Sequence, residues 1–423
     1  MSQVSDFPLK DLLNLNKSTW KPSQNAGDVH LYSIPAFDAG KFELVDSSTI
    51  KSNKFIVPNK AILFSKLNPK FPRVWLIDED NSTSVRLASS EFLVLIPKNK
   101  EDLYFLYFLL RSVNLRNQLV GYATGTSNSH QRFLPQDLLK IKVLVPSSKS
   151  ERLSIGTKLH NIESLANCNT KLADDLHRYM KNIFRLTIVD YPKNLKDLDK
   201  FSGALPKELR LSKDSLAQMQ SNSHELPNKW ASKKLTEIAT YLNGLALQKY
   251  PPLLNSTDLK VIKIQQLQKM NTADADFANC KLNQDYIIEN GDVLFSWSAT
   301  LLIRVWTAGT GALNQHLFKV QGTSVPDWFA YFATERHMPW FRIIAGGKAT
   351  TMGHIQRTHL SQCKIPVPDK DYLAFLDKFF SPLWSYMVEL SVANNRIKNL
   401  IDTTLSNFQS SDTFEIYSKS KAS

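Results

Sequence analysis

The pattern of apolar and polar positions divides the chain into short apolar runs and two long periodic stretches. The short runs are rich in β-branched or aromatic residues and are bounded by Asn, Gly or Pro, which is typical of strands. Examples are "AILFS", "FLVLIP", "DVLFSWS" and "HLFKVQG". An aromatic-rich helix is expected after them in each half, at "DLYFLYFLLR" and "DWFAYFATER". These runs predict globular parts of the α+β class.

The two long stretches follow a heptad, with spacings that alternate between three and four residues. Such a pattern over four heptads predicts a coiled coil. The alternative is a pair of ordinary amphipathic helices, each packed on its own globular part. The expected seam positions are Ile162, Leu165, Asn169, Leu172, Leu176, Tyr179, Ile183 and Leu186 in the first stretch, and Leu376, Phe380, Leu383, Met387, Leu390, Asn394, Ile397, Ile401 and Phe408 in the second.

Two asparagines, Asn169 and Asn394, interrupt the predicted seams 225 positions apart. They would approach each other if the helices paired antiparallel. A polar residue in a seam fixes the register at a cost in stability, so we expect Asn169→Leu to raise coil stability and loosen the register. The alternative is that each asparagine is merely tolerated.

The chain also repeats itself. "GYATGTSNSHQRFL" from Gly121 is echoed by "GGKATTMGHIQRTHL" from Gly346. A shift of 225 matches Gly121, Thr126, Gln131 and Arg132 with Gly346, Thr351, Gln356 and Arg357. Upstream, "FIVPNKAILFSK" resembles "YIIENGDVLFSW" at a shift of 231, and both copies reach a Val-Pro pair before the long helix. This is the signature of a tandem duplication.

The duplication predicts six segments. Globular parts are expected at residues 1–147 and 228–368, with long helices at 148–189 and 369–410. A connector at 190–227 is rich in Lys, Asp, Ser and Asn and contains three prolines, and a tail follows at 411–423.

Charge directs attention to an anionic partner. The net charge is +13 and the pI about 9.4 over 423 residues, so nucleic acid is the first candidate partner and an anionic membrane surface the second. The longest apolar run, "LYFLYFLL", is too short to cross a bilayer, and the start does not resemble a signal peptide. The three cysteines lack disulfide or zinc spacing, which favours a reducing cytoplasm.

The motifs that would indicate chemistry are incomplete. Gly347-Lys348 lacks the partner residues of a phosphate loop, since Arg342 and Ala349 stand in their places. "NPKF" at 68–71 resembles the loop with which amino-methyltransferases hold a flipped base, but a lysine replaces its second proline and no glycine-rich cofactor loop accompanies it. No nuclease carboxylate pattern or histidine metal motif is present. The sequence therefore predicts a binding protein without a catalytic or metal site of its own.

Polar and basic residues near aromatic ones form the candidate DNA contacts. Arg and Lys suit phosphates and guanine edges, whereas Asn and Gln suit adenine edges. Ordinary solvated loops are the alternative. The candidates are Lys66, Asn68, Lys70, Arg73, Thr126, Asn128, Gln131 and Arg132 in the first repeat, and Lys348, Thr350, Thr351, His354, Gln356 and Arg357 in the second.

Several stretches resemble the specificity subunit of type I restriction–modification systems. They are "YSIPAFDAGKF", "LFSKLNPKFPRVW", "LPNKW", "GALNQHLFKV" and "GGKATTMGHIQRTHL", and the resemblance covers about Leu31 to Phe408. In the first repeat "TGTSNSHQR" stands where "TTMGHIQR" would be expected. The two copies are therefore expected to differ in what they contact.

The resemblance implies a division of labour. Each globular part would be a target recognition domain that reads half of a split DNA site, and the long helices would form an antiparallel coiled coil with pseudo-twofold symmetry. Two modification (M) subunits would dock and methylate adenines with S-adenosylmethionine, and a restriction and motor (R) subunit would use ATP and Mg²⁺. The chain itself would bind no cofactor and catalyse nothing.

The length of the first helix agrees with a spacer role. Its 31 steps from Ile155 to Leu186 span ~47 Å at ~1.5 Å per residue, which suits half-sites about one DNA turn, ~34–36 Å, apart. Two other functions stay open at this point: a self-sufficient DNA-modifying enzyme, and a coiled-coil scaffold that binds nucleic acid without sequence preference.

Overall fold

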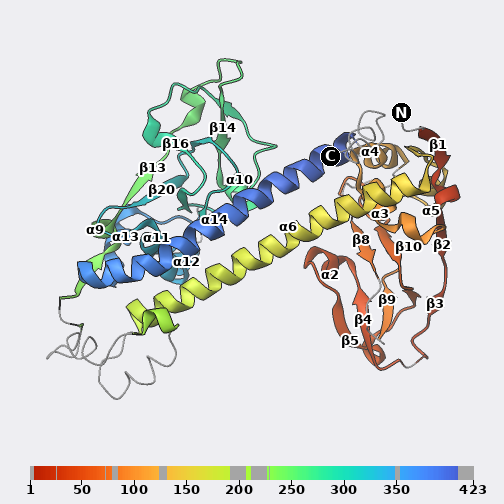
Figure 1. The fold of residues 1–423 in the computed structure, drawn as a ribbon, viewed down its shortest axis with the longest axis horizontal. Helices are drawn as coiled ribbons and strands as arrows, with labels where there is room; N and C mark the ends of the chain where they lie inside the picture. Colours follow the sequence, from red (N-terminus) through yellow and green to blue (C-terminus); the bar gives the residue numbers. More distant parts are fainter. Residues whose placement is uncertain are drawn as a thin grey trace. The chain divides into compact units, whose positions relative to one another are not determined.

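The computed structural model describes residues 4–24, 26–71, 73–78, 84–122, 131–190, 206–210, 226–227, 229–347 and 353–407. The chain divides into two compact units (Figure 1). Unit 1 comprises Met1–Leu165 and Ile397–Ser423, and unit 2 comprises Ala166–Arg396. Each unit therefore contains one globular part and a segment of each long helix.

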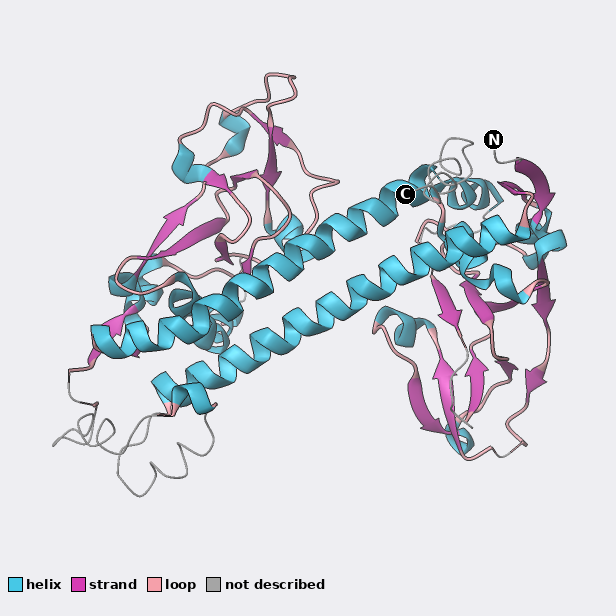
Figure 2. Ribbon diagram, in the orientation of Figure 1, coloured by secondary structure: helices cyan, strands magenta, loops and turns pink. Residues whose placement is uncertain are grey.

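Unit 1 contains three sheets (Figure 2), with strand orders β2-β10-β7-β8, β3-β6-β9-β4-β5 and β1-β11. The strands are β1 (Val4–Pro8), β2 (Leu13–Asn16), β3 (Thr19–Trp20), β4 (Asp28–Tyr32), β5 (Glu43–Asp46), β6 (Lys54–Ile56), β7 (Ala61–Ser65), β8 (Val74–Ile77), β9 (Val85–Ala88), β10 (Phe92–Pro97) and β11 (Lys142–Pro146). The short helices are α1 (Leu9–Leu12), α2 (Ile34–Asp38), α3 (Leu103–Arg111), α4 (Val113–Tyr122) and α5 (Pro135–Lys140).

Unit 2 has the same plan except that its second sheet has four strands instead of five, with strand orders β13-β20-β17-β18, β15-β14-β19-β16 and β12-β21. The strands are β12 (Ala231–Lys234), β13 (Ala239–Asn243), β14 (Leu259–Ile262), β15 (Phe277–Ala278), β16 (Ile287–Ile288), β17 (Val293–Ser296), β18 (Leu302–Val305), β19 (Gly311–Leu313), β20 (Leu317–Gly322) and β21 (Lys364–Val367). The short helices are α9 (Leu235–Ile238), α10 (Ile264–Lys269), α11 (Asp327–Arg336), α12 (Met338–Gly346) and α13 (Arg357–Gln362).

Strand register confirms the duplication. Phe92 of β10 pairs with Ser65 of β7, and Leu317 of β20 pairs with Ser296 of β17. One parallel pair recurs as well, β4 with β9 in unit 1 and β14 with β19 in unit 2. The predicted strands at β7, β10, β17 and β20 and the predicted helices at α3 and α11 are confirmed.

The short helix α3 is buried because it is apolar on nearly every face. It lies between the β7 and β8 side of its sheet and the first long helix, α6 (Lys149–Phe184), with Phe105 and Phe108 fully buried. A Cβ added to Gly156 of α6 would lie 2.4 Å from the backbone nitrogen of Phe105. The glycine therefore lets α6 approach the backbone of α3 directly.

A buried ion pair ties the same two elements. Arg152 of α6 donates from Nε and Nη2 to the two carboxylate oxygens of Asp102, which precedes α3, at 3.1 and 2.9 Å. Their side chains are 6% and 3% exposed. Arg152 also donates to the Pro146 carbonyl oxygen at 2.8 Å, so its hydrogen bonds are well satisfied, as a buried charge requires.

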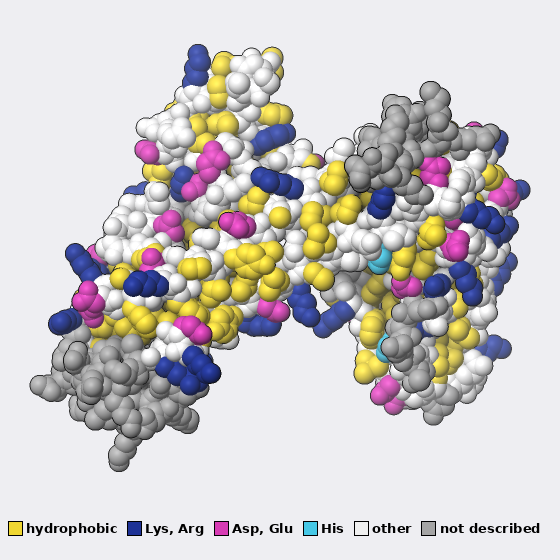
Figure 3. All heavy atoms as spheres, in the orientation of Figure 1, with side chains coloured by type: hydrophobic (Ala, Val, Ile, Leu, Met, Phe, Trp, Pro, Cys, Tyr) yellow, Lys and Arg dark blue, Asp and Glu magenta, His cyan; other side chains and the backbone are white. Residues whose placement is uncertain are grey.

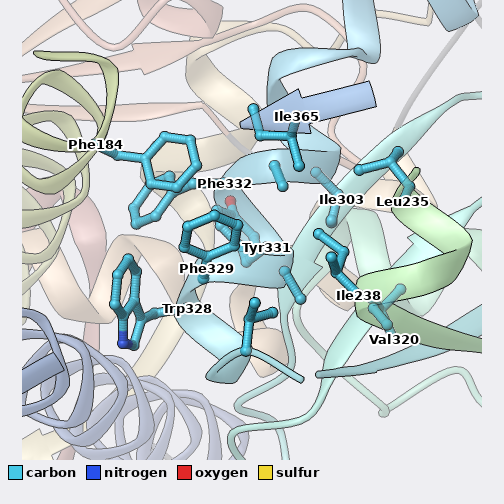
Figure 4. Packing of buried hydrophobic residues seen from close by; sticks show 14 of the residues in the cluster. Phe184, Leu235, Ile238, Ile303, Val320, Trp328, Phe329, Tyr331, Phe332 and Ile365 are labelled. Carbon is cyan, nitrogen blue, oxygen red and sulfur yellow. The ribbon is translucent and has the colours of Figure 1, made fainter. Parts of the chain in front are cut away.

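In unit 2, α6 meets a core rich in aromatic residues. Phe184 packs against Phe329 and Phe332 of α11 (Figure 4), with ring centroids 5.2 and 5.6 Å apart. Trp328 stacks at 4.1 Å on Phe380 of the second long helix, α14 (Lys370–Asn407). Both long helices therefore cover α11. Leu209, from the connector, also joins this core.

Within unit 2 the long helices run antiparallel. Thr170 meets Asn394, and nine residues further along α6, Tyr179 meets Phe379 near the beginning of α14. The predicted antiparallel pairing of two long helices is confirmed. Within the described part of the chain, no helix is both long and apolar enough to cross a membrane.

The heptad predicted for the first helix is wrong at three positions. Leu165, Leu172 and Tyr179 are 53%, 40% and 41% exposed, whereas Ala166 and Met180 are buried. At each of these positions the next residue lies further inward: Ala166 and Met180 are buried and Ala173 is half-buried. The offset is the same at all three, so the second position of each predicted pair lies four residues after the first rather than three. In α14 the predicted Leu376, Phe380, Met387 and Ile401 are buried, and Phe408 lies outside the described residues.

Asn394, which is expected to approach Asn169, forms a hydrogen bond with the residue after Asn169. Asn394 is 5% exposed and donates from Nδ2 to Thr170 Oγ1 at 2.6 Å. The buried positions of α6 and α14 correspond at a shift of 221. Ile155 and Leu159 of α6 are buried, and so are Leu376 and Phe380, which lie 221 positions later in α14. At this shift the residue that corresponds to Asn394 is Ala173. Asn394 is buried and Asn169 is half-buried, so the two asparagines are not equivalent in the seam.

Candidate nucleic-acid interface

Junction 1 is a contact between two loops of the first globular part. The turn after β7 carries Lys66, Leu67 and Asn68, and Leu67 forms an isolated antiparallel bridge with Arg132. The Asn68 amide donates to the Gln131 carbonyl oxygen at 2.8 Å. Buried Ser65 closes the turn by donating from its hydroxyl to the Leu67 carbonyl oxygen at 3.3 Å. Gln131 and Arg132 belong to the repeated stretch that begins at Gly121.

An ion pair crosses junction 1. Glu91, which immediately precedes β10, accepts from the Arg132 guanidinium at 3.0 and 3.2 Å. The Lys66 amide donates to the Glu91 carbonyl oxygen at 2.9 Å. Arg132 keeps 53% of its side chain exposed, so this pair lies where a ligand can reach it. We define junction 1 as Lys66, Leu67, Asn68, Glu91, Gln131 and Arg132.

Two further candidates lie beside junction 1. Lys70 is exposed, next to Phe71, which is 65% exposed. Arg73 turns away and forms a bidentate ion pair with Asp38 of α2, at 2.7 and 3.0 Å. The hydrogen bond from Arg73 lowers the pKa of the Asp38 carboxyl from its usual value. The structure therefore gives Arg73 a role in holding α2.

Junction 2 repeats the same backbone arrangement in unit 2. Ser298 bridges His354 antiparallel, and the Ala299 amide donates to the Gly353 carbonyl oxygen at 2.9 Å. Ser296 donates from its hydroxyl to the Ser298 carbonyl oxygen at 3.1 Å, as Ser65 does in junction 1. Asn68 and Ala299 also share a left-handed backbone, each with φ 53°. The two turns are thus equivalent in pairing and in conformation.

The side chains of junction 2 are different in kind. The Trp297 indole donates to Asn243 Oδ1 at 3.0 Å and to the Gln315 carbonyl oxygen at 3.2 Å. Ser298 Oγ lies 3.2 Å from His316 Nδ1. The His316 and His354 rings lie 5.7 and 6.5 Å from Trp297. We define junction 2 as Trp297, Ser298, Ala299, His316, Gly353 and His354.

Three positions therefore correspond between the junctions, namely Lys66 with Trp297, Glu91 with His316, and Arg132 with His354. Junction 1 presents a cation beside an ion pair, whereas junction 2 presents an indole between two imidazoles. A shared backbone with different side chains suits the reading of two different ligand edges, because donors, acceptors and charges decide which base edge is accepted.

The sequence pairing of Gln131 with Gln356 and of Arg132 with Arg357 is wrong. The backbone matches these residues with Gly353 and His354, a shift of 222. Gln356 instead begins α13, where its amide is capped by His359 Nδ1 at 3.0 Å. Arg357 donates to the Tyr241 carbonyl oxygen at 3.0 Å and lies over the Phe318 ring.

The structure thus brings together Lys66, Asn68, Gln131 and Arg132, and it places His354 in the matched site. Gln356 and Arg357 lie beyond junction 2, along α13. Thr126, Asn128, Lys348, Thr350 and Thr351 lie outside the described residues. Sequence reasoning missed Glu91, Trp297, Ser298 and His316 as site residues. The shifts of 225 and 231 already contained this signal, because they align Glu91 with His316 and Lys66 with Trp297.

Among the described residues, no group of three or more His, Cys, Asp or Glu side chains could hold a metal ion. The same part of the chain shows three cysteines that form no disulfide: Cys168 is exposed, Cys280 is half-buried and Cys363 is buried.

Comparison with known proteins places the chain in a family. The family model for the type I restriction modification DNA specificity domain matches residues 1–177 and 227–383. A search of curated proteins gave no match.

Three solved structures are similar to this chain. The S subunit of a type I restriction-modification system from M. genitalium has 12% identity, covers 96% of both chains and has a TM-score of 0.56. A chain from a structure described as showing complex assembly and conformational transition of the type I R-M system has 15% identity, covers 97% of this chain and 98% of its own, and has a TM-score of 0.37. The HsdS subunit of Thermoanaerobacter tengcongensis has 14% identity, covers 97% of both chains and has a TM-score of 0.36.

The first of these likenesses supports the fold, and the family match covers most of the sequence in two separate regions. The chain therefore belongs to the family of type I restriction modification DNA specificity domains, and it carries two such domains in tandem.

Proposed function

We propose that the chain is the DNA-reading specificity subunit of a type I restriction–modification complex, in which each globular part reads one half of a bipartite site. One observation carries the proposal: junctions 1 and 2 share their backbone pairing but differ at the three corresponding side chains. A single half-site read twice would favour the same side chains in both copies. The net charge of +13 supports DNA as the ligand, because phosphate contacts dominate its affinity.

In this proposal the chain holds DNA and its partners carry out the reaction. Methylation of a base within a duplex requires that the base be flipped out, and modification subunits would do this with S-adenosylmethionine. A restriction and motor subunit would supply ATP- and Mg²⁺-dependent cleavage. The catalytic motifs in the sequence are incomplete, which is consistent with this division of labour.

The long helices are the proposed docking surface for the modification subunits. Leu172 and Tyr179 of α6 and Tyr386 of α14 are 40%, 41% and 48% exposed. Figure 3 shows hydrophobic side chains gathered over the long helices in unit 2. Exposed apolar side chains of this kind mark interaction surfaces. Leu172→Asp should reduce co-purification with a modification subunit, whereas Leu44→Asp, at another exposed leucine in β5, should leave it unchanged.

The test of the proposed function is co-expression with the modification subunit encoded beside this chain, followed by genome-wide mapping of methylated adenines. We expect methylation at one split, asymmetric sequence. Retention of scrambled and cognate duplexes to the same extent would instead favour a nucleic-acid scaffold without specificity. Methylation or cleavage by the purified chain alone would favour a self-sufficient enzyme.

A further inference from the structure

The loop before β14 presents a leucine to solvent. Leu254 is 91% exposed, and its backbone is left-handed, with φ 59°. That conformation is strained for a residue other than glycine, and an exposed leucine forgoes the stability that burial would give. A loop that only connected two elements would favour Gly or Asn at this position. Both features make Leu254 an unexplained residue of the fold.

The loop is held in place around this leucine. The Asp258 carboxylate accepts from the amides of Leu253 and Asn255, at 3.0 and 3.2 Å, and thereby clamps the backbone on both sides of the tip. Asn255 in turn accepts from the amide and the hydroxyl of Thr257, at 3.1 and 2.8 Å. The leucine is therefore presented on an ordered turn, and ordering it on binding would cost little.

The loop also contacts the two residues that follow β15, Asn279 and Cys280. The Asn279 amide donates to the Tyr250 carbonyl oxygen at 3.1 Å, and Thr257 Oγ1 lies 3.3 Å from Cys280 Sγ. These contacts bring the exposed Lys281 to one side of the loop, while the exposed Lys249 begins the other side. The one carboxylate within the turn, Asp258, is committed to backbone amides. An apolar tip between lysines fits an anionic ligand with an apolar interior.

One aromatic side chain extends this surface along β15. Phe277 is 48% exposed, and Lys260 Nζ lies 3.9 Å from the centroid of its ring. Lysines and exposed apolar side chains together are typical of surfaces that bind nucleic acid, since the cations contact phosphates and the apolar groups contact bases. These observations favour DNA over a protein partner.

We propose that Leu254 is an apolar base contact of the second globular part, with Lys249 and Lys281 on the neighbouring phosphates. The proposal rests on the proposed function and adds a contact that is separate from junction 2. The leucine would either touch thymine methyl groups in the major groove or enter between two base steps as a wedge. The corresponding loop of the first part, before β4, reads "KPSQNAG" and has no leucine, so the contact belongs to the second half-site alone.

The test uses the full chain assembled with its modification subunit. The duplex carries the recognition sequence that the methylation map identifies. Leu254→Ala should weaken cognate binding about tenfold, the equivalent of ~1.4 kcal/mol, and leave binding to a scrambled duplex unchanged. Asp258→Ala, which removes the clamp, should reproduce part of the loss. The matched control is Leu44→Ala, at a leucine of unit 1 that is 63% exposed, and it should have no effect.

Two sets of modified duplexes separate the modes of contact. If Leu254 touches methyl groups, replacing thymines of the second half-site by uracil should weaken the wild-type complex and not Leu254→Ala. If Leu254 is a wedge, it should unstack the bases, so the fluorescence of 2-aminopurine in the second half-site should rise on binding of the wild-type complex and not on binding of Leu254→Ala. Cognate affinity that is the same for wild type and Leu254→Ala would overturn the assignment of Leu254 alone. The assignment would also be overturned if Leu254→Ala lost the modification subunit while its affinity for DNA stayed the same. A wild-type complex that cannot distinguish cognate from scrambled DNA would overturn the proposed function itself.

Discussion

At the scale of single residues, Asn68 and Ala299 show how one backbone geometry is kept with different chemistry. Both are left-handed with φ 53°, and both donate their amide to the residue before the bridge. Asparagine is among the few residues that adopt this conformation readily, whereas alanine does so at a cost. Retention of the strained turn in both copies indicates that the junction geometry matters more than its local stability.

Ala299→Gly should therefore stabilise unit 2, by about 1 kcal/mol, because glycine adopts a positive φ without strain. Thermal unfolding of the wild type and the variant measures the change. Ala393→Gly is the matched control, since this exposed alanine lies within α14, where glycine costs ~1 kcal/mol of helix propensity. Stabilisation by both variants, or destabilisation by both, would show that strain at Ala299 is not the cause.

The site residues could be predicted from the sequence only in part. Lys66, Asn68, Gln131 and Arg132 were found because they lie near repeated motifs. Their partners in the second copy were misassigned, because the identical Gln-Arg pairs at 131–132 and 356–357 suggested a shift of 225. In the structure, Arg132 bridges the turn after β7 in the same way that His354 bridges the turn after β17, which is a shift of 222. Two identical side chains are weaker evidence that positions correspond than the backbone bridge that each turn forms.

At the scale of elements, the strands and helices follow the sequence closely, and the helix seam does not. Apolar runs such as "AILFS" form buried strands because both faces of β7 are covered. The long helices were expected from periodicity and were found. The inward face of α6 includes the small residues Ala166 and Ala173, one position after the leucines that the heptad count selects. A count of large apolar residues does not detect alanines in a seam.

Gly156 provides a test of how α6 docks on α3. Gly156→Ala should destabilise unit 1 by about 1–3 kcal/mol, because the new methyl group would overlap the Phe105 backbone, 2.4 Å away. Helix propensity alone predicts the opposite, a gain of ~1 kcal/mol. Denaturant unfolding decides between them. Gly121→Ala in α4, where nothing lies within 4 Å, should be neutral or stabilising.

The asparagine in the seam gives a second test between elements. Asn394 has a buried Oδ1 without a hydrogen-bond partner among the described residues, and such an atom costs about 1–3 kcal/mol. Asn394→Leu should therefore raise the free energy of unfolding, by about 1 kcal/mol. Asn169→Leu should do less, because Asn169 is only half-buried, whereas Asn394 is 5% exposed.

Thr170→Val completes this comparison. In the wild type it should cost about 1 kcal/mol, since Asn394 would lose its partner, and in the Asn394→Leu background it should cost nothing. Equal costs of Thr170→Val in both backgrounds would show that the hydrogen bond contributes nothing to the seam.

At the scale of the whole molecule, neither repeat makes a compact unit alone. Ile401 and Leu405, from the second repeat, are buried in the core of unit 1, and Met180 and Phe184, from the first repeat, are buried in the core of unit 2. Each globular part is completed by the helix of the other. This exchange explains why the two domains are joined in one chain, and why their readers can diverge while the helices keep their roles.

The central claim is that each domain reads its own half of the site through its junction. The most direct measurement is a genome-wide methylation map of the complex in which junction 1 carries the side chains of junction 2, as Lys66→Trp, Glu91→His and Arg132→His, with thermal unfolding as the check on folding. We expect the half-site read by the first domain to change or relax, while the second half and the gap stay the same. An unchanged map from a folded variant, or a change in both halves, would contradict it.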